Sequence, residues 1–156
     1  MEINISIDKE FKKQVKSVWL KNLARQIQIA EKVSTKSEMT LVITGDEKIH
    51  ELNLKYLAED RPTDVLSFPM NELHNSEPAF VNISDGKLHL GDVVISYPTA
   101  ARQAEEHHHS VNREIAILLI HGILHLLGHD HDIPARKQAM NEREVIILKI
   151  IEEQGL

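Results

Sequence analysis

The chain has 156 residues, of which 42% are hydrophobic and 27% are charged, and it contains no cysteine. This composition is typical of one globular domain spanning residues 1–156, and it excludes disulfide bonds and thiolate metal ligands. A formal net charge of −6 argues against a surface coated with basic groups for non-specific binding of nucleic acid.

Neither a targeting segment nor a membrane span is expected in this chain. The N-terminal residues are charged from position 2 onward and lack the long apolar stretch of a signal peptide. The longest wholly apolar run covers residues 115–120 and is too short to cross a bilayer. We therefore expect a cytoplasmic protein without a membrane partner.

The first part of the chain predicts strands and helices in alternation. Residues 2–8 alternate polar and apolar side chains, which is typical of a half-buried strand. Apolar residues recur at helical spacing from Phe11 to about Val33 and predict an amphipathic helix. The apolar, β-branched residues 39–44 predict a second strand, and residues 46–57 predict a short helix that begins with acidic side chains.

The remaining part predicts two further strands and three helices. Residues 65–68 predict a short strand that Pro69 ends, and residues 90–96 predict the last strand. Between them, residues 70–88 read as a long exposed connection. Helices are predicted from Pro98 to Glu106, from the N-cap Ser110 to Leu127, and from Pro134 to Glu153. We therefore expect an α+β domain in which a small mixed sheet packs against helices.

The stretch HGILHLLGHDH, residues 121–131, predicts a metal site. His121 and His125 are four residues apart, so they share one face of a helix and can converge on one ion. Gly128 permits the left-handed conformation that ends a helix, which places His131 to complete the set. Since the surrounding helix is apolar almost all round, its imidazoles need partners, and a shared zinc-like ion would satisfy them.

This pattern is typical of a catalytic rather than a structural site, because three ligands leave a position open for water or substrate. His129 is disfavoured as a fourth ligand because it lies only two residues from His131 on the same turn. Gly122 occupies the position where metzincin proteases place their general-base glutamate. Peptide hydrolysis by the usual zincin route is therefore disfavoured, while activation of a metal-bound water remains possible.

Other polar residues near the motif have two interpretations each. Asp130 and Asp132 can orient an imidazole through its second nitrogen, or they are simple turn residues. Glu114 lies two helical turns before His121 and either supports the site or is a first-turn charge. The triplet 107–109 is expected to be an exposed helix end that binds metal adventitiously at most, because consecutive helical residues point in different directions and make poor joint ligands.

Three segments together resemble one known family. They are HGILHLLGHDH at 121–131, RPTDVLSFP at 61–69 and GDVVIS at 91–96. In sequence, order and separation they resemble the YbeY family of bacterial endoribonucleases, and the resemblance covers nearly the whole chain. It implies a single-domain α+β fold with a zincin-like site.

The resemblance also implies a function. Zinc would be held by His121, His125 and His131, although nickel, cobalt or copper also suit three imidazoles. The activity implied is that of a single-strand-specific endoribonuclease, which acts in ribosomal RNA maturation at the 3′ end of the small-subunit RNA and in ribosome quality control. The implied partners are ribosomal RNA and the small ribosomal subunit with its assembly factors, and no DNA partner is expected.

Two positions depart from the usual pattern of that family. The family usually has tyrosine where this chain has His129, and it commonly has arginine where this chain has Leu57, directly after Tyr56. A guanidinium at that place would suit a phosphate group, and Arg61 or Lys55 could take over this role. We therefore expect Arg61 either to contribute to substrate binding or to be an ordinary turn residue, and we predict no catalytic side chain.

Two alternatives to a ribonuclease stay open at this point. One is another metal-dependent hydrolase such as a peptidase, which would need a base from a distant segment. The other is a non-enzymatic, metal-stabilised assembly factor of the ribosome. Whether water or the RNA 2′-hydroxyl attacks the phosphate is also left open.

Overall fold

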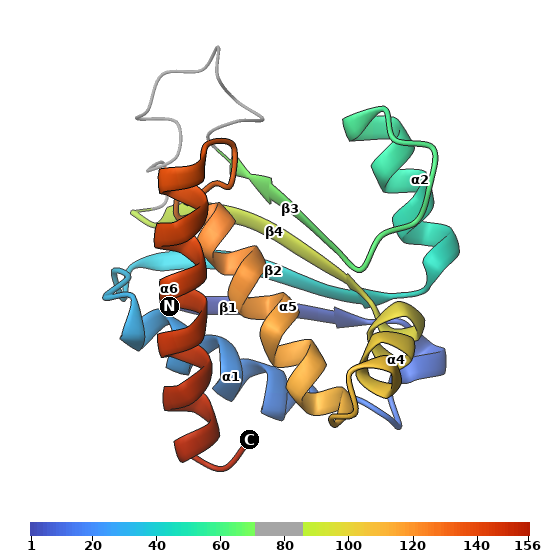
Figure 1. Cartoon of the computed structure of the whole chain (residues 1–156), viewed down its shortest axis with the longest axis horizontal. Coiled ribbons are helices and arrows are strands. Elements are labelled where there is room, and N and C mark those ends of the chain that lie inside the picture. The colour runs from blue at the N-terminus through green and yellow to red at the C-terminus, as the bar shows by residue number, and fades with distance from the viewer. Residues whose placement is uncertain (71–85) are drawn as a thin grey trace.

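A computed structural model describes residues 1–70 and 86–156, which form one α+β domain (Figure 1). Its sheet has four strands in the order β1-β2-β4-β3. Strands β1, β2 and β4 run parallel to one another, and β3 pairs antiparallel with β4 at one edge. The strands span Glu2–Ile7 (β1), Ser37–Thr44 (β2), Val65–Pro69 (β3) and Leu88–Ser96 (β4). The predicted mixed sheet and α+β class are confirmed.

Five α-helices accompany the sheet in the part of the chain that the structure describes. They are α1 (Ser17–Ala30), α2 (Asp46–Leu57), α4 (Tyr97–Glu106), α5 (Val111–Leu126) and α6 (Pro134–Glu153), and a short 3-10 helix, η1, covers Lys9–Phe11. Helix α5 crosses one face of the sheet over β3 and β4, flanked by α1 and α6 (Figure 1). None of these helices combines the length and apolarity that a membrane span requires.

The main core lies between α5 and the sheet. Helix α5 buries Ile115, Leu119 and Ile123 completely, as expected for a helix that is apolar almost all round. A smaller apolar cluster, which includes Leu66 and Phe68, lies on the opposite face of the sheet. Strand β3 therefore has one face toward α5 and one face toward this second cluster, as the alternation of side chains along a strand requires.

Three expected boundaries differ from the structure. The helix expected from Phe11 begins at Ser17, because Phe11 ends a 3-10 turn that directs its ring against Tyr97, 5.2 Å between centroids. Pro69 is the last residue of β3 rather than the residue after it, which is tolerated because β3 is an edge strand and proline lacks an amide donor. Of the long connection expected at 70–88, residues 71–85 lie outside the described part, and Leu88 already belongs to β4.

Candidate metal centre

Three histidine side chains converge beside the C-terminal end of α5. The ring centroids of His121 and His125 are 4.7 Å apart, those of His125 and His131 are 5.3 Å apart, and those of His121 and His131 are 6.1 Å apart. Each ring offers a nitrogen such that the three donor atoms lie within 4.8 Å of one another. The structure thus brings together the three residues that the spacing predicted as ligands.

The end of α5 explains how His131 reaches the other two. Gly128 adopts a left-handed conformation with φ of +97°, and its amide donates to the carbonyl of His125 (3.0 Å). The amide of His129 donates to the carbonyl of Leu124, also at 3.0 Å. These two bonds form a Schellman motif, which closes the helix and reverses the chain. The reversal carries His131 back over the helix face, while His129 is not part of the converging set.

A carboxylate from another helix accompanies the histidines. Glu144, on α6, places its Oε1 3.5 Å from Nδ1 of His121, and this glutamate is largely buried. A carboxylate at this position fixes the imidazole ring and directs its other nitrogen toward the centre of the cluster. Sequence reasoning missed Glu144, because the pattern of α6 does not say which of its faces meets α5.

The two aspartates considered for this orienting role differ in their contacts. Asp130 accepts the backbone amide of His131 (2.7 Å) and lies 3.8 Å from its Nδ1, so it braces the third histidine. Asp132 instead accepts the amide of Ile133 (3.0 Å) and pairs with Arg136 (3.0 Å). Asp132 is therefore a turn residue at the start of α6.

The environment favours the neutral form of His125, which is the form that coordinates metals. Burial lowers the pKa of His125, and repulsion by His121 and His131 lowers this pKa further, although the carboxylates of Asp130 and Glu144 oppose the shift. At neutral pH His125 therefore presents a free lone pair. The donor set of three nitrogens, partly open to solvent, suits a borderline divalent ion such as zinc.

Gly122, the residue that stands in place of a zincin base, packs directly against the sheet. A Cβ at this position would lie 2.6 Å from Cγ1 of Val93, 3.1 Å from its Cγ2 and 3.3 Å from Oγ of Ser67. The Ser67 hydroxyl also donates to the carbonyl of Gly122 (3.1 Å). Because β3 and β4 fill the space that a side chain would need, position 122 cannot present a carboxylate without moving α5.

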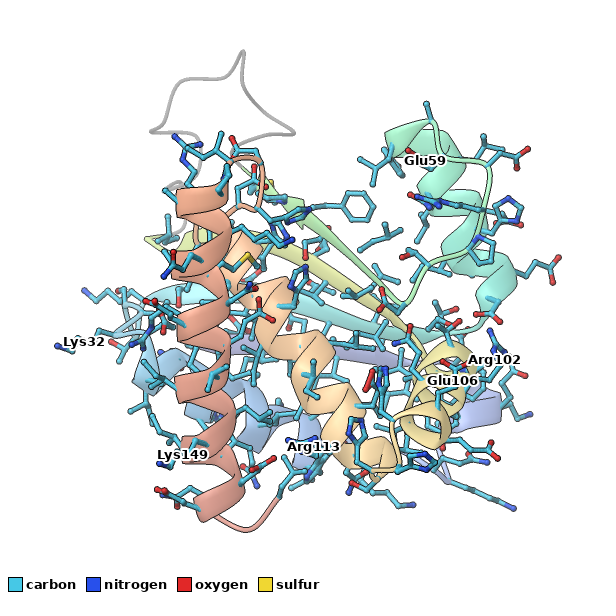
Figure 2. The ribbon with its side chains drawn as sticks, in the orientation of Figure 1. Lys32, Glu59, Arg102, Glu106, Arg113 and Lys149 are labelled. Carbon is cyan, nitrogen blue, oxygen red and sulfur yellow. The ribbon has the colours of Figure 1, made fainter. Side chains whose placement is uncertain are left out.

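Arg61, the residue expected to bind substrate, lies in the segment between α2 and β3 and is not part of the histidine cluster. Its side chain is 75% exposed and its Nε lies 3.6 Å from Oε2 of Glu59, which follows α2 (Figure 2). Its carbonyl accepts a hydrogen bond from the buried Asn53 (2.9 Å). Lys55 lies 5.2 Å from the ring centroid of Tyr56. The structure therefore ties Arg61 to α2 and does not test its role toward substrate.

Glu114 is an acidic residue in the first turn of α5, as one of its two interpretations held, and part of the expectation for the histidine triplet needs correction. The Glu114 carboxylate is buried and accepts from Gln103 (3.0 Å) and shares a hydrogen bond with His109 (2.8 Å), so its contacts lie away from His121. His109 is mostly buried, and it converges with His107 on Glu114. His107 and His108 are exposed and directly follow α4, as expected of a helix end, but the expectation of poor joint ligands was wrong, because His107 and His109 both face Glu114.

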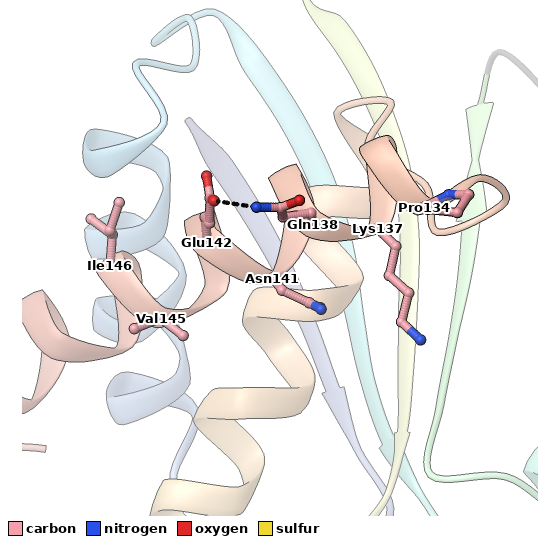
Figure 3. A pocket seen from close by; sticks show the side chains of 7 residues that line it. All are labelled: Pro134, Lys137, Gln138, Asn141, Glu142, Val145 and Ile146. Carbon is pink, nitrogen blue, oxygen red and sulfur yellow. Dashed lines mark hydrogen bonds between the residues drawn. The ribbon is translucent and has the colours of Figure 1, made fainter.

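Two hollows lie apart from the histidine cluster. One runs along the outer face of α6 and is lined by Pro134, Lys137, Gln138, Asn141, Glu142, Val145 and Ile146 (Figure 3). The other lies between α2 and the second face of the sheet and is lined by Thr40, Val42, Leu52, Tyr56, Phe68, Asp92 and Val94. Burial raises the pKa of Asp92 in this second hollow, opposed by a hydrogen bond from Thr40. Neither hollow contains the three histidines.

Comparison with known proteins yields consistent matches over the chain. The family model described as Endoribonuclease YbeY matches residues 2–152. Endoribonuclease YbeY of Dehalococcoides mccartyi (strain CBDB1) is 46% identical to this chain, and the alignment covers 98% of this chain and 95% of the relative. The protein of that name from Moorella thermoacetica is 49% identical over 76% of each chain.

A solved structure agrees with these sequence matches. The solution structure of TM1509 from Thermotoga maritima has a TM-score of 0.61 and 25% sequence identity, covering 94% of this chain and 87% of that one. The family match spans the histidine motif, the strand that precedes α4, and the edge strand β3. The chain belongs to the endoribonuclease YbeY family.

Proposed function

We propose that this protein is a zinc-dependent, single-strand-specific endoribonuclease that acts in maturation of the small-subunit ribosomal RNA at its 3′ end and in ribosome quality control. The observation that carries the proposal is the convergence of His121, His125 and His131 in a chain whose relatives are named endoribonucleases. RNA is the substrate, and the small ribosomal subunit with its assembly factors is the setting in which the substrate is met.

The three histidines would hold the ion, and the residues present suit it. Their donor atoms are close enough to share one centre, the chain has no thiolate to compete, and the exposure of His131 leaves one side open. When bound, such an ion polarises a phosphate oxygen and lowers the pKa of water. Other divalent transition metals suit the same donor set.

The chain's own residues prepare the site for a phosphodiester. Glu144 orients His121, and Asp130 holds the backbone of His131, so the donor atoms are fixed before substrate arrives. Arg61 presents an exposed guanidinium on the segment that leads into β3, and we assign to it a contact with the RNA backbone. Since Gly122 offers no base, the position that supplies the proton acceptor in zincin proteases has no side chain here, which disfavours the peptidase alternative.

The proposal is tested by replacing one proposed ligand and one nearby histidine outside the set. We expect His125→Ala to abolish cleavage of single-stranded RNA while thermal unfolding still shows a folded protein. His129→Ala is the matched control, because His129 follows the same helix but does not join the cluster, and it should cleave at nearly the wild-type rate. Undiminished cleavage by the His125 variant would overturn the proposal.

The same preparation separates the remaining alternatives. A wild-type protein that binds the ion, shows no cleavage of single-stranded RNA and unfolds when the ion is chelated would favour the assembly-factor alternative, to which the absence of arginine at Leu57 lends support. The chemistry of the products identifies the attacking group. A 2′,3′-cyclic phosphate indicates attack by the RNA 2′-hydroxyl, whereas products with a 5′-phosphate and a 3′-hydroxyl indicate attack by water.

A further inference from the structure

We propose that His107, His109 and Glu114 form a second site for a divalent transition metal, separate from the three-histidine centre and structural in role. The two histidines lie in the turn between α4 and α5, and the glutamate lies in the first turns of α5. One donor atom from each lies within 4.8 Å of the other two. The proposal does not depend on the nuclease activity.

The backbone of the turn explains why two histidines in an uninterrupted triplet can act together. His108 adopts a left-handed conformation with φ of +56°, so the chain reverses between its two neighbours. As a result His107 and His109 lie on the same side, 5.6 Å apart between ring centroids, while His108 is exposed. Within a regular helix these two side chains would diverge.

The distances are close to those of a coordination sphere. Nε2 of His109 lies 2.8 Å and Nδ1 of His107 lies 3.7 Å from the same oxygen, Oε2 of Glu114. Bonds of about 2.0–2.1 Å in a tetrahedral site place neighbouring donor atoms roughly 3.3 Å apart. The two observed distances lie on either side of that value, and the two imidazole nitrogens lie within 4.8 Å of each other, so side-chain rotations that move the donor atoms by roughly 1 Å would form the site.

The burial of Glu114 points to a cation as its partner. Only 3% of this residue is exposed, and the donors that contact its carboxylate are the amide of Gln103 and the imidazole of His109. The amide is neutral, His107 lies further away at 3.7 Å, and Nδ1 of His109 already accepts from Arg113, so a bound cation would supply the charge that best stabilises a buried carboxylate. Two imidazoles and a carboxylate select zinc, cobalt or nickel over magnesium or calcium.

Binding of the ion would require Arg113 to give up its hydrogen bond to His109. Its Nη1 donates to Nδ1 of His109 (2.9 Å), so the proton of that ring lies on Nε2, facing Glu114. Coordination through Nε2 requires the proton to move to Nδ1, and Arg113 must then release His109. Arg113 keeps a second partner, Oε1 of Glu152 at 2.6 Å from its Nε, and it lies at the accessible start of α5 (Figure 2).

Three protein ligands leave a fourth position open at this site as well, but its place in the fold indicates a structural role. Glu114 precedes His121 by seven residues, which is about 10.5 Å along a helix, whereas paired catalytic ions lie about 3.5–4 Å apart. Gln103 bridges Glu114 and Asp64, the residue directly before β3 (3.0 and 3.2 Å). An ion here would therefore fasten the α4–α5 turn to α5 and, through Gln103, to the start of the edge strand.

The test counts zinc ions per chain by equilibrium dialysis and metal analysis. The wild-type protein should bind two. His121→Ala with His125→Ala removes the first centre and should leave one, and adding His107→Ala should weaken the remaining binding at least tenfold. His107 is 59% exposed, so its loss should not unfold the protein. His108→Asn is the matched control, because asparagine tolerates the left-handed conformation, and it should bind like its parent.

Cobalt absorption and Arg113 provide a second readout. Cobalt bound to the His121 and His125 double variant should show the visible bands of a nitrogen–oxygen site. Arg113→Ala should tighten this binding or leave it unchanged, because it removes the competitor for Nδ1 of His109. The proposal is refuted if the double variant binds no zinc, or if the His107 and His108 variants weaken binding equally, since that pattern indicates loose capture by the histidine tract.

Discussion

The closest approach between α5 and the sheet, at Gly122, allows a quantitative prediction. In Gly122→Ala the new methyl group would lie 2.6 Å from Cγ1 of Val93, which is fully buried and stiff because it is β-branched. Overpacking of a tight core costs about 3 kcal/mol at the upper end of its usual range. Alanine restores about 1 kcal/mol through its better helix propensity. We therefore expect a net loss of about 2 kcal/mol in the free energy of unfolding.

Thermal and urea unfolding of four proteins measures this loss and its origin. A 2 kcal/mol loss corresponds to a fall of roughly 4–8 °C in Tm for a chain of this size. Val93→Ala alone should lower the free energy of unfolding by about 2 kcal/mol, because it leaves a cavity. The double variant should be little less stable than either single variant, because the new methyl group fills the space that valine vacated. The coupling energy of this cycle should thus be about 2 kcal/mol. Additive losses, or a Gly122→Ala protein more stable than wild type, would refute the reasoning.

Three further predictions concern charged groups. Glu144→Gln should weaken zinc binding about 10–100-fold, because an amide orients His121 less strongly than a carboxylate does. Competition with a chelator measures this loss, and the Tm of the metal-free protein should change little. Burial raises the pKa of Asp46, but its hydrogen bonds outweigh this effect and, with the charge of Arg102, hold that pKa below its ordinary value. Asp46→Asn should therefore lower the free energy of unfolding by about 1–2 kcal/mol at pH 7. Urea unfolding should show this difference shrinking below about pH 4, because the wild-type carboxylate is then protonated. Burial raises the pKa of Asp92, so the charged carboxylate opposes folding at a pH above that pKa. Asp92→Asn should therefore raise the free energy of unfolding at pH 7 by roughly 0.5–1 kcal/mol and leave it unchanged near pH 3.

The proposed ligands could be predicted from sequence because their geometry is almost entirely local. His121 and His125 are related by one helical turn, and the position of His131 follows from the Schellman motif that Gly128 permits. All of these residues lie within eleven positions. The apolar surroundings that bury the helix are also visible in the same segment. Short-range periodicity and one glycine therefore suffice to bring the three rings together.

The features that sequence reasoning missed depend on packing between distant segments or on one backbone angle. Glu144 meets His121 only because α6 packs against α5 with that face inward, and no short-range pattern specifies this rotation. The pairing of His107 with His109 depends on the positive φ of His108, a conformation that histidine adopts less often than glycine. The start of α1 was placed too early, since Phe11 continues the apolar period of the helix without belonging to it.

The packing of α5 also constrains where proton transfer can take place. In a zincin helix the residue after the first histidine supplies the base, but here that position is backed by Val93 and by Ser67, whose hydroxyl is committed to the carbonyl of Gly122. The side of the cluster toward the sheet is therefore closed to a carboxylate. The open side is that of His131, which is exposed. A proton acceptor that is not part of this helix position would therefore reach the cluster from the side of His131, where solvent has access.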